Sequence, residues 1–591
     1  MPQFVQKQSF EVNSYTNCVL FNEFSILNEF PSVRSDCQNA LNLTKTLTWG
    51  VDHGCSLFVT SNECIDIFFD RFLEIHDMAN AKYEKKVLVI VDFHTEIDVL
   101  RTLGSEMVTR WIPLTLVLQP HHSGQWINIY SGFGSDVNRF FIENSTLEHD
   151  KPLIPQILTD FGGKEIVTAL FEYPPFVSIA KVDAGMGNAN LFGSNETLSI
   201  KLQGFEALLM VEFCRIFNCV ISARLEYDED MWGWGFRNHT GYGIMGAILK
   251  YDADLTAAGC YLMHDRYELI QYSYAIQRSS VIHILPKPKP LPLWNIPLLP
   301  FSAVIWKNVA IVLTTVAIFI FILNRIQVRY LPKFSKNSTL IVVQMSLFQN
   351  VERLNYSTAT NSIIYGTFLI YSIMIGNFYI GGLSSIMTVT PYEPPIDSLE
   401  KLISSNLKWG GNTISWTYAI KESSDPNHQK YVSKFIVPET EDLQKLIKDE
   451  KIAVALDRTQ AGTASVHNLL TRDDSKHLMI MKERLYAQYS VLIASKTFPY
   501  MEQLNKMAFW QQESGIREIW EYETVVRKMD YVVQRNLVDN MKPPTNKEPV
   551  KLSVPHIFGA GFILLFGYLF ATIAFAAEIF HSKYVRRVKK N

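Results

Sequence analysis

A single arginine, Arg266, lies in the stretch YDADLTAAGCYLMHDRYELIQYSY (residues 251–274), amid apolar and aromatic residues. A guanidinium stays charged when it is desolvated, and its planar fork matches a carboxylate with two parallel hydrogen bonds. Arg266 is therefore a candidate binding group for a carboxylate. Most arginines keep a solvated head at the surface, so a surface position or a structural salt bridge is the alternative.

Other chemistries have little support in the residues. The stretches GSNET and HHSGQW contain Ser or His, but no nucleophile and base are paired at a useful spacing. The glycine-rich GMGNANLFG lacks a phosphate-loop lysine, and no CxxC pair suggests zinc. The net charge of -3 gives no broad basic face for nucleic acid. We therefore expect no enzyme activity, no cofactor, no metal site and no nucleic-acid partner.

The cysteines leave several pairings open. If the N-terminal region is extracellular, Cys55 with Cys64, or Cys18 with Cys37, are candidate disulfides. Cys214 and Cys219 lie five residues apart in a predicted helix, where a disulfide is awkward. There are seven cysteines, so at least one thiol is free or intermolecular.

Long apolar segments predict a membrane protein. Hydrophobic residues make up 48% of the chain, charged residues only 19%, and the mean hydropathy is +0.04. About 20 apolar residues cross the ~30 Å hydrocarbon core as a helix, and residues 300–324, 361–389 and 552–577 meet that length. Residues 338–350 are too short to cross. They fit a re-entrant segment that lines a water-filled cavity, or an interfacial helix.

The basic residues predict the orientation of these spans. Arg325, Arg329, Lys333 and Lys336 follow the first span, and five basic residues follow the last. Both regions are then cytoplasmic by the positive-inside rule, and residues 1–300 and 390–550 lie outside the cell. The N-x-S/T sequons at Asn42, Asn144, Asn195 and Asn238 are then candidate glycosylation sites. The N-terminus lacks the pattern of a signal peptide, so we expect an incomplete gene model or targeting by a later segment.

The two outside blocks read as α/β structure. IVTALFEYPPFVSI predicts a strand broken by Pro174 and Pro175, and GFEALLMVEFCRIFNCVISARL a helix followed by a strand. In the second block, NLKWGG, KIAVALD and YSVLIASK predict strands, and EDLQKLIKDE predicts a helix. Two α/β lobes follow, with a ligand in the crevice beyond the strand ends. Residues 1–160 also alternate buried strands and helices, which indicates a further compact α/β domain.

The order lobe, span, re-entrant segment, span, lobe, span resembles that of ionotropic glutamate receptor subunits. Several local motifs are similar too. EYPPF (172–176) resembles the family's E-x-P-Y/F, and DADLTAAGCYLMHDRYELIQYSY resembles ADIAVAPLTITxxRExVIDFS. FYIGGLSSIMTV (378–389) is similar to the gating-helix end SYTANLAAFLTV, KIAVALD to KYAFLLE, and SLFQN lies where the family has the pore-loop ALMQQG. The resemblance runs from about residue 165 to 580, and it implies an α/β bilobed periplasmic-binding-protein-like extracellular module plus an α-helical channel domain with three spans and a re-entrant pore loop.

The departures from the family pattern are informative. Members that bind amino acids have Pro and Thr before the arginine, where this chain has Gly259 and Tyr261. Gly381 and Gly382 replace Ala and Asn in the gating helix, and no cysteine follows Cys260 to form the second lobe's usual disulfide. Such drift matches the divergent arthropod chemosensory ionotropic receptors better than synaptic receptors.

The resemblance also implies roles for single residues. Arg266 aligns with the arginine that grips a ligand carboxylate, and Asp457 with the carboxylate that holds an ammonium; a strand-end turn is the alternative for Asp457. Thr417 is the candidate for the second lobe's Ser/Thr position, and Tyr261 narrows the pocket with an aromatic wall. The pore residues are then Gln349 and Asn350, although Gln349 as a mere cap of the re-entrant helix is the alternative. The gate residues are Tyr379 and Leu383.

Together these features predict a subunit of a ligand-gated non-selective cation channel that acts as a taste or smell receptor. The alternative is a non-conducting co-receptor or trafficking subunit; a transporter is disfavoured by three spans without an inverted repeat. We expect a small acid, amine or amino acid as ligand, co-receptor subunits in a hetero-tetramer, membrane lipid around the spans, and a plasma-membrane location. The expected domains are an amino-terminal domain (1–160), two parts of a ligand-binding domain (161–298 and 395–545), three transmembrane helices (299–325, 360–389 and 552–579), a pore loop (337–351) and a cytoplasmic tail (580–591).

Overall fold

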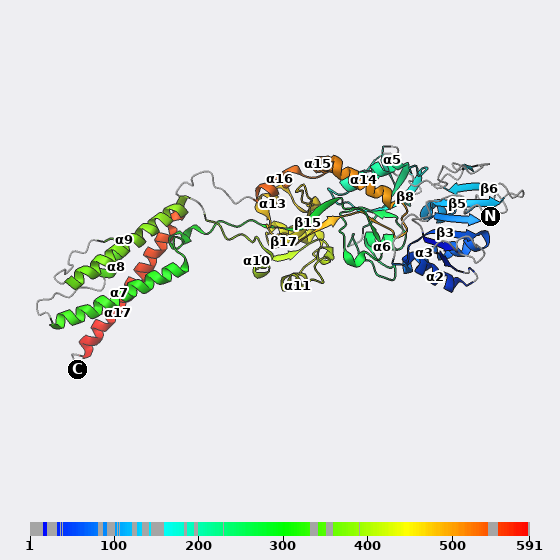
Figure 1. Ribbon diagram of the computed structural model, residues 1–591. Coiled ribbons are helices and arrows are strands. Elements are labelled where there is room, and N and C mark those ends of the chain that lie inside the picture. Colours follow the sequence, from blue (N-terminus) through cyan, green and yellow to red (C-terminus); the bar gives the residue numbers. More distant parts are fainter. Residues whose placement is uncertain are drawn as a thin grey trace. The chain divides into compact units, whose positions relative to one another are not determined.

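The structure is a computed structural model (Figure 1). It describes residues 16–19, 32–80, 87–91, 101–120, 127–132, 141–142, 159–330, 341–349, 359–388, 391–541 and 554–588, with short gaps at 36, 38, 103, 106, 183–185, 194–198 and 228–229. The chain divides into two compact units. One comprises residues 1–286 and 397–541, and the other residues 287–396 and 542–591.

The first unit begins with a seven-stranded sheet in the order β2-β1-β3-β4-β5-β6-β7. Its strands are β1 (Thr16–Val19), β2 (Ser32–Arg34), β3 (Cys55–Ser61), β4 (Val87–Val91), β5 (Leu114–Pro120), β6 (Ile127–Gly132) and β7 (Phe141–Ile142). The strands up to β5 pair in parallel, which explains why VLVIV and LTLVL are almost continuously apolar. The helices α2 (Ala40–Asp52) and α3 (Ile65–Met78) pack together beside this sheet (Figure 1).

The first lobe is built on an eight-stranded sheet in the order β14-β20-β13-β8-β12-β10-β11-β9. Its strands are β8 (Lys164–Leu170), β9 (Ser178–Lys181), β10 (Ala189–Leu191), β11 (Ser199–Gln203), β12 (Cys219–Leu225), β13 (Leu255–Thr256), β14 (Gln271–Tyr272) and β20 (Ile493–Ala494). Its helices are α5 (Phe205–Phe217), α6 (Gly243–Leu249), α14 (Met501–Ser514) and α15 (Ile516–Lys528). The strand β8 ends just before EYPPF, because Pro174 and Pro175 offer no N–H to a ladder.

The second lobe is built on a five-stranded sheet in the order β16-β17-β15-β18, with β19 also paired to β15. Its strands are β15 (Gln277–Pro286), β16 (Lys408–Gly410), β17 (Ile452–Arg458), β18 (Leu478–Ile480) and β19 (Tyr486–Ser490). Its helices are α10 (Leu399–Ser404), α11 (Pro426–Ser433), α12 (Thr440–Lys448), α13 (Arg472–His477) and α16 (Tyr531–Asp539). The predicted two-lobed α/β module is thereby confirmed.

Two strands carry the chain between the lobes. The strand β15 follows β14 of the first lobe, and β19 of the second lobe leads into β20 of the first. The stretch YSVLIASK, predicted as one strand, is therefore two, because the chain passes from one sheet to the other after Ser490. Paired crossing strands of this kind form a natural hinge between lobes.

The disulfides correct the sequence analysis. Cys37 pairs with Cys64, so both predicted pairings, Cys55 with Cys64 and Cys18 with Cys37, are wrong. Cys214 and Cys219 do form a disulfide, against expectation. The helix α5 ends at Phe217 and Asn218 takes a left-handed conformation, which turns the chain back and leaves the two Cα atoms 4.4 Å apart. Within the described part of the chain, Cys260 is the free cysteine, and it is buried.

The second unit contains the helices α7 (Ala303–Tyr330), α8 (Ile341–Ser346), α9 (Ala359–Thr388) and α17 (Phe558–Val588) (Figure 1). Among the described residues, α7, α9 and α17 are the three helices long and apolar enough to cross a membrane. An apolar core that includes Ile320, Ile341 and Phe368 joins α7, α8 and α9. The apolar side chains of α17 stay exposed, as expected where lipid or another subunit covers a helix.

Candidate functional site

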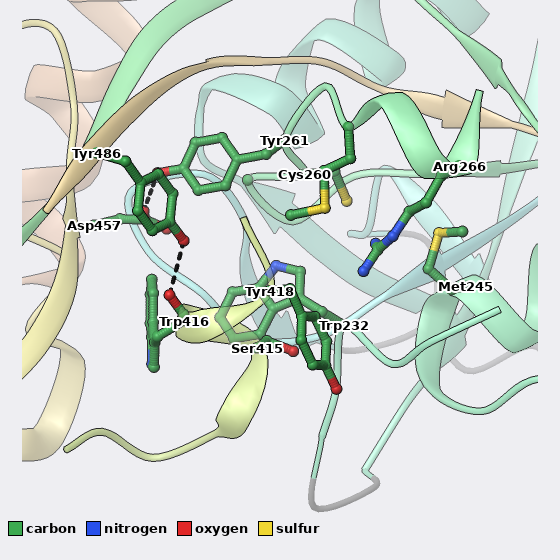
Figure 2. Close-up of a pocket in the computed structure, with 12 residues that line it drawn as sticks. Trp232, Met245, Cys260, Tyr261, Arg266, Ser415, Trp416, Tyr418, Asp457 and Tyr486 are labelled. Atoms are coloured by element: carbon green, nitrogen blue, oxygen red, sulfur yellow. Dashed lines mark hydrogen bonds between the residues drawn. The ribbon is translucent and has the colours of Figure 1, made fainter. Parts of the chain in front are cut away.

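A pocket lies between the two lobes and is lined mainly by aromatic and sulfur-containing side chains (Figure 2). It encloses about 440 Å³ of space, counting its open mouth. The first lobe contributes Trp232, Met245, Gly259, Cys260, Tyr261, Met263 and Arg266, and the second lobe Ser415, Trp416, Tyr418, Asp457 and Tyr486. Arg266 and Asp457 lie at opposite ends of this pocket in Figure 2.

Arg266 is a buried cation that makes no ion pair with any described residue. It ends a short 3-10 helix (His264–Arg266), and its side chain reaches into the pocket. The residue is only 7% exposed, and its Nε has no hydrogen-bond partner. Its guanidinium lies 4.8 Å from the ring centroid of Trp234 and 5.8 Å from that of Tyr418. Among the described residues no carboxylate is within ion-pair distance of it, and the carboxylate of the pocket, Asp457, lies at the opposite end.

Asp457 is bound by two tyrosines of the opposite lobe. It lies near the end of β17 and is 1% exposed. The Tyr173 hydroxyl donates to its Oδ2 at 2.8 Å, and the Tyr261 hydroxyl donates to its Oδ1. Burial raises the pKa of Asp457 to about 7, while the two hydrogen bonds act in the opposite direction. Tyr173, in the quoted EYPPF, has a role that the sequence analysis missed.

Asp230 forms a second contact between the lobes, which was also missed. It lies in the loop after β12 of the first lobe and accepts hydrogen bonds from three hydroxyls of the second. The donors are Thr413 (2.9 Å), Ser415 (2.6 Å) and Tyr418 (2.8 Å). The only sequence signal is an acidic cluster, DED, directly before the aromatic MWGWGF.

Aromatic rings pack around this second contact. Trp232 lies edge-on to Trp416 with ring centroids 5.4 Å apart, and Trp234 to Tyr418 at 4.7 Å. Each pair joins the first-lobe loop to the second lobe. The two lobes are therefore held together by hydroxyl–carboxylate bonds and by ring contacts.

Gly259 is required by its backbone conformation. Its φ is +67°, and its N–H donates to Glu206 Oε2 at 2.8 Å. Proline, which the resemblance leads one to expect there, fixes φ near -65° and has no N–H, so it fits neither requirement. Ser490 Oγ donates to Oε1 of the same carboxylate at 2.6 Å, and burial raises the pKa of Glu206 to about 7. Glu206 thus links Gly259, which lines the pocket, to Ser490 at the end of β19, the strand that leads from the second lobe to the first.

Thr417, the residue predicted for the second lobe's Ser/Thr position, lies two residues after a serine that lines the pocket. Thr417 is buried, and its Oγ1 donates to the Ile414 carbonyl at 2.8 Å within a 3-10 helix (Ile414–Thr417). It does not line the pocket, whereas Ser415 does. In this short segment a difference of two residues decides which hydroxyl, that of Ser415 or that of Thr417, lines the pocket.

The residues predicted to form the pore and the gate lie in the second unit. Gln349 is exposed just after α8, and its N–H donates to the Gln344 carbonyl at 2.8 Å; Asn350 lies outside the described residues. The Tyr379 hydroxyl donates to the Pro297 carbonyl at 3.0 Å, and Leu383 is half-buried on α9.

The candidate glycosylation sites are only partly described. Asn42 and Asn238 are exposed, while Asn144 and Asn195 lie outside the described residues.

The arrangement can bind a small molecule. The pocket combines one cation, one carboxylate that already has two donors, and an aromatic wall. In the part of the chain that the structure describes, no group of three or more His, Cys, Asp or Glu side chains is placed to hold a metal. Recognition by charge and shape is the chemistry that these residues support.

Comparisons with known proteins agree with the channel-like order of elements. Residues 302–568 match the family model described as ligand-gated ion channel. The chain is 22% identical over 196 residues to mouse (Mus musculus) glutamate receptor ionotropic, delta-1, covering 32% of this chain and 19% of that receptor. It is 22% identical over 184 residues to the human (Homo sapiens) receptor of the same name, covering 29% of this chain and 18% of the receptor. The matched stretch thus spans about a fifth of these relatives.

Proposed function

We propose that this chain, which belongs to the ionotropic glutamate receptor superfamily, is a subunit of a ligand-gated, non-selective cation channel that acts as a chemosensory receptor. The observation that carries the proposal is the pocket between the lobes, where Arg266 has no ion-pair partner among the described residues, in a chain that also holds the candidate membrane helices α7, α9 and α17. A ligand that binds both lobes stabilises their closed arrangement, and it biases opening only by that preference.

The linkers offer a route from lobe closure to the spans. The chain leaves the second lobe at the end of β15 and reaches α7, and it returns after α9. Between these points the Glu393 N–H donates to the Lys289 carbonyl at 2.9 Å, and the Leu291 N–H donates to the Pro391 carbonyl at 2.8 Å. The two linkers are thus hydrogen-bonded to each other, so a pull on one is transmitted to both helices.

The remaining assignments belong to the same proposal. Residues 1–160 form the amino-terminal domain, 161–298 and 395–545 the ligand-binding domain, and 337–351 the pore loop with Gln349 and Asn350. Tyr379 and Leu383 form the gate. We place the chain in the plasma membrane with its lobes and the sequons Asn42, Asn144, Asn195 and Asn238 outside, as one subunit of a hetero-tetramer with co-receptor subunits.

The test is a recording from cells that express this chain with candidate co-receptor subunits, under a panel of small acids, amines and amino acids. A ligand-evoked current should disappear with Arg266→Ala at unchanged surface level. Arg237→Ala is the matched control, because this first-lobe arginine is 84% exposed and pairs at the surface with Glu268. A current that survives Arg266→Ala but not Arg237→Ala would contradict the assignment of the pocket.

A non-conducting co-receptor is the second candidate. It is favoured by Asp230 and Asp457, which join the lobes directly through hydroxyls of the chain itself. The two candidates differ in the pore. If this chain lines it, Gln349→Arg should change the reversal potential of the ligand-evoked current; an unchanged reversal potential favours the co-receptor.

A further inference from the structure

The three carboxylates around the pocket already have donors. Asp457 accepts from Tyr173 and Tyr261. Glu206 accepts from the Gly259 N–H and the Ser490 hydroxyl, and Asp230 from three hydroxyls. Asp457, which lines the pocket, is only 1% exposed, so a ligand ammonium could reach its carboxylate only by moving one of the two tyrosine hydroxyls aside. The ammonium would also lose its own hydration shell.

Arg266, in contrast to these carboxylates, is not fully hydrogen-bonded within the described part of the chain. Arg266 is only 7% exposed, its Nε has no hydrogen-bond partner among the described residues, and its guanidinium lies over the rings of Trp234 and Tyr418. A planar carboxylate can approach the edge of such a guanidinium and form two parallel hydrogen bonds. Binding an anion here removes an unpaired buried charge, whereas binding a cation adds a second one.

The side chains that line the rest of the pocket determine which kind of body the ligand can carry beside its carboxylate. Besides Arg266, Ser415 and Asp457, the described residues that line the pocket are glycine or carry an aromatic ring or a sulfur atom. Trp232, Trp416 and Tyr486 contribute aromatic rings to the lining, and Met245 and Met263 have flexible side chains that can adapt to a ligand's outline. These walls suit a compact apolar or aromatic body.

We propose that the pocket selects carboxylic acids that have a compact apolar body and no ammonium group, and that Tyr173 and Tyr261 impose this selectivity by occupying Asp457. The inference rests on the proposed function of the pocket as the ligand site. Tyr173 and Tyr261 act as specificity-determining residues: both come from the first lobe, and both donate to the carboxylate that an amino-acid ligand would require. The raised pKa of Asp457 supports the same conclusion, because a carboxyl that readily takes up a proton is a weak partner for ammonium.

The test uses matched ligand sets on the purified full chain in lipid nanodiscs. Each set has one body with three head groups: 3-phenylpropanoate, phenylalanine and phenethylamine; hexanoate, norleucine and pentylamine; propanoate, alanine and ethylamine. Dissociation constants are measured by calorimetry at neutral pH. We expect at least one acid to bind, its amino acid to bind at least tenfold more weakly, and its amine not to bind. Arg266→Ala should abolish binding of the acid, and Arg237→Ala should not.

The role of the two tyrosines is tested by the ratio of the dissociation constants for an acid and its amino acid. A general loss of stability affects both constants and therefore cancels in this ratio. Tyr261→Phe and Tyr173→Phe each keep the ring and free one oxygen of Asp457 for a ligand ammonium. In each variant the preference for the acid over its amino acid should fall at least fivefold. The proposal is overturned if no acid in the panel binds, if an amino acid or amine binds as tightly as its acid, or if both phenylalanine variants keep the wild-type ratio.

These experiments test the selectivity of the pocket and the channel role of the chain independently of each other. Calorimetry on the chain alone needs no pore, so binding of acids without any current in cells would leave the selectivity in place and remove the channel role. Currents evoked by amino acids, in contrast, would support the channel role and overturn the selectivity.

Discussion

Replacing Asp230 by asparagine should weaken the contact between the lobes. The carboxylate accepts three hydrogen bonds of 2.6 to 2.9 Å from Thr413, Ser415 and Tyr418. Bonds to a charged acceptor are roughly twice as strong as neutral ones, and a neutral bond contributes about 1 kcal/mol. In asparagine the amide oxygen can keep the two bonds from Thr413 and Ser415, each weaker by about 1 kcal/mol, and the amide NH2 can donate to the Tyr418 hydroxyl instead of accepting from it. The loss is then about 2 kcal/mol, which is a ~30-fold shift in the equilibrium between closed and open lobes.

Amide hydrogen exchange measures this shift without a ligand. In the purified full chain, the segment around residues 413–418 should exchange up to ~30-fold faster in Asp230→Asn, because each opening of the lobes exposes it. Asp252→Asn is the matched control, since Asp252 pairs with Arg224 at the surface of the first lobe, at 2.9 Å. Unchanged exchange in Asp230→Asn, or equal acceleration in the control, would refute the reasoning.

Two further predictions concern Asp457 and Gly259. The folded-state pKa of Asp457 is raised from 3.8 to about 7, so the folded chain binds more protons than the unfolded chain between these values, and stability falls as pH rises through that window. Asp457→Asn removes this loss, so its melting temperature relative to wild type should rise between pH 4.5 and pH 7, with a free-energy slope of at most about 1.4 kcal/mol per pH unit; parallel profiles would contradict the assignment. Gly259→Ala should lower the melting temperature more than Gly193→Ala, although both glycines have positive φ (+67° and +75°) and each change costs about 1 kcal/mol in backbone strain. The difference arises because an added Cβ meets the Phe176 ring at 3.2 Å at Gly259 and nothing within 4 Å at Gly193; equal losses would show that this contact is relieved at no cost.

Much of the architecture could be predicted because it depends on local patterns. Apolar runs long enough to cross a membrane predict α7, α9 and α17, and the helical spacing in GFEALLMVEFCRIF predicts α5. The predictions from the sequence were wrong at places where the chain changes direction. The stretch YSVLIASK was predicted as one strand, but it changes sheets after Ser490, and the turn at Asn218 brings Cys214 and Cys219 together.

Only some residues of the candidate site could be predicted from the sequence. Arg266 could be singled out because a lone cation in an apolar stretch is unusual, and the pocket lining includes it together with Tyr261 and Asp457. Thr417 lies just outside that lining, because irregular backbone has no periodicity from which to predict the facing side chain. Tyr173 had no signal of its own, and Asp230 had only the acidic cluster DED before MWGWGF, since each residue acts through a partner in the other lobe.

The sequence by itself determined the classes of structure: three helices long and apolar enough to cross a membrane, two α/β lobes separated by two of them, and a cation in the stretch between α6 and β15. These follow from composition and from periodicity, which act over fewer than about 30 residues. Only the tertiary structure decided the electrostatic state of the pocket. Whether a carboxylate is free to hold a ligand depends on the donors that reach it, and the Tyr173 hydroxyl that reaches Asp457 lies 284 residues away in the chain. The pairing of such distant groups is set by how the lobes fold and close, which no local pattern records.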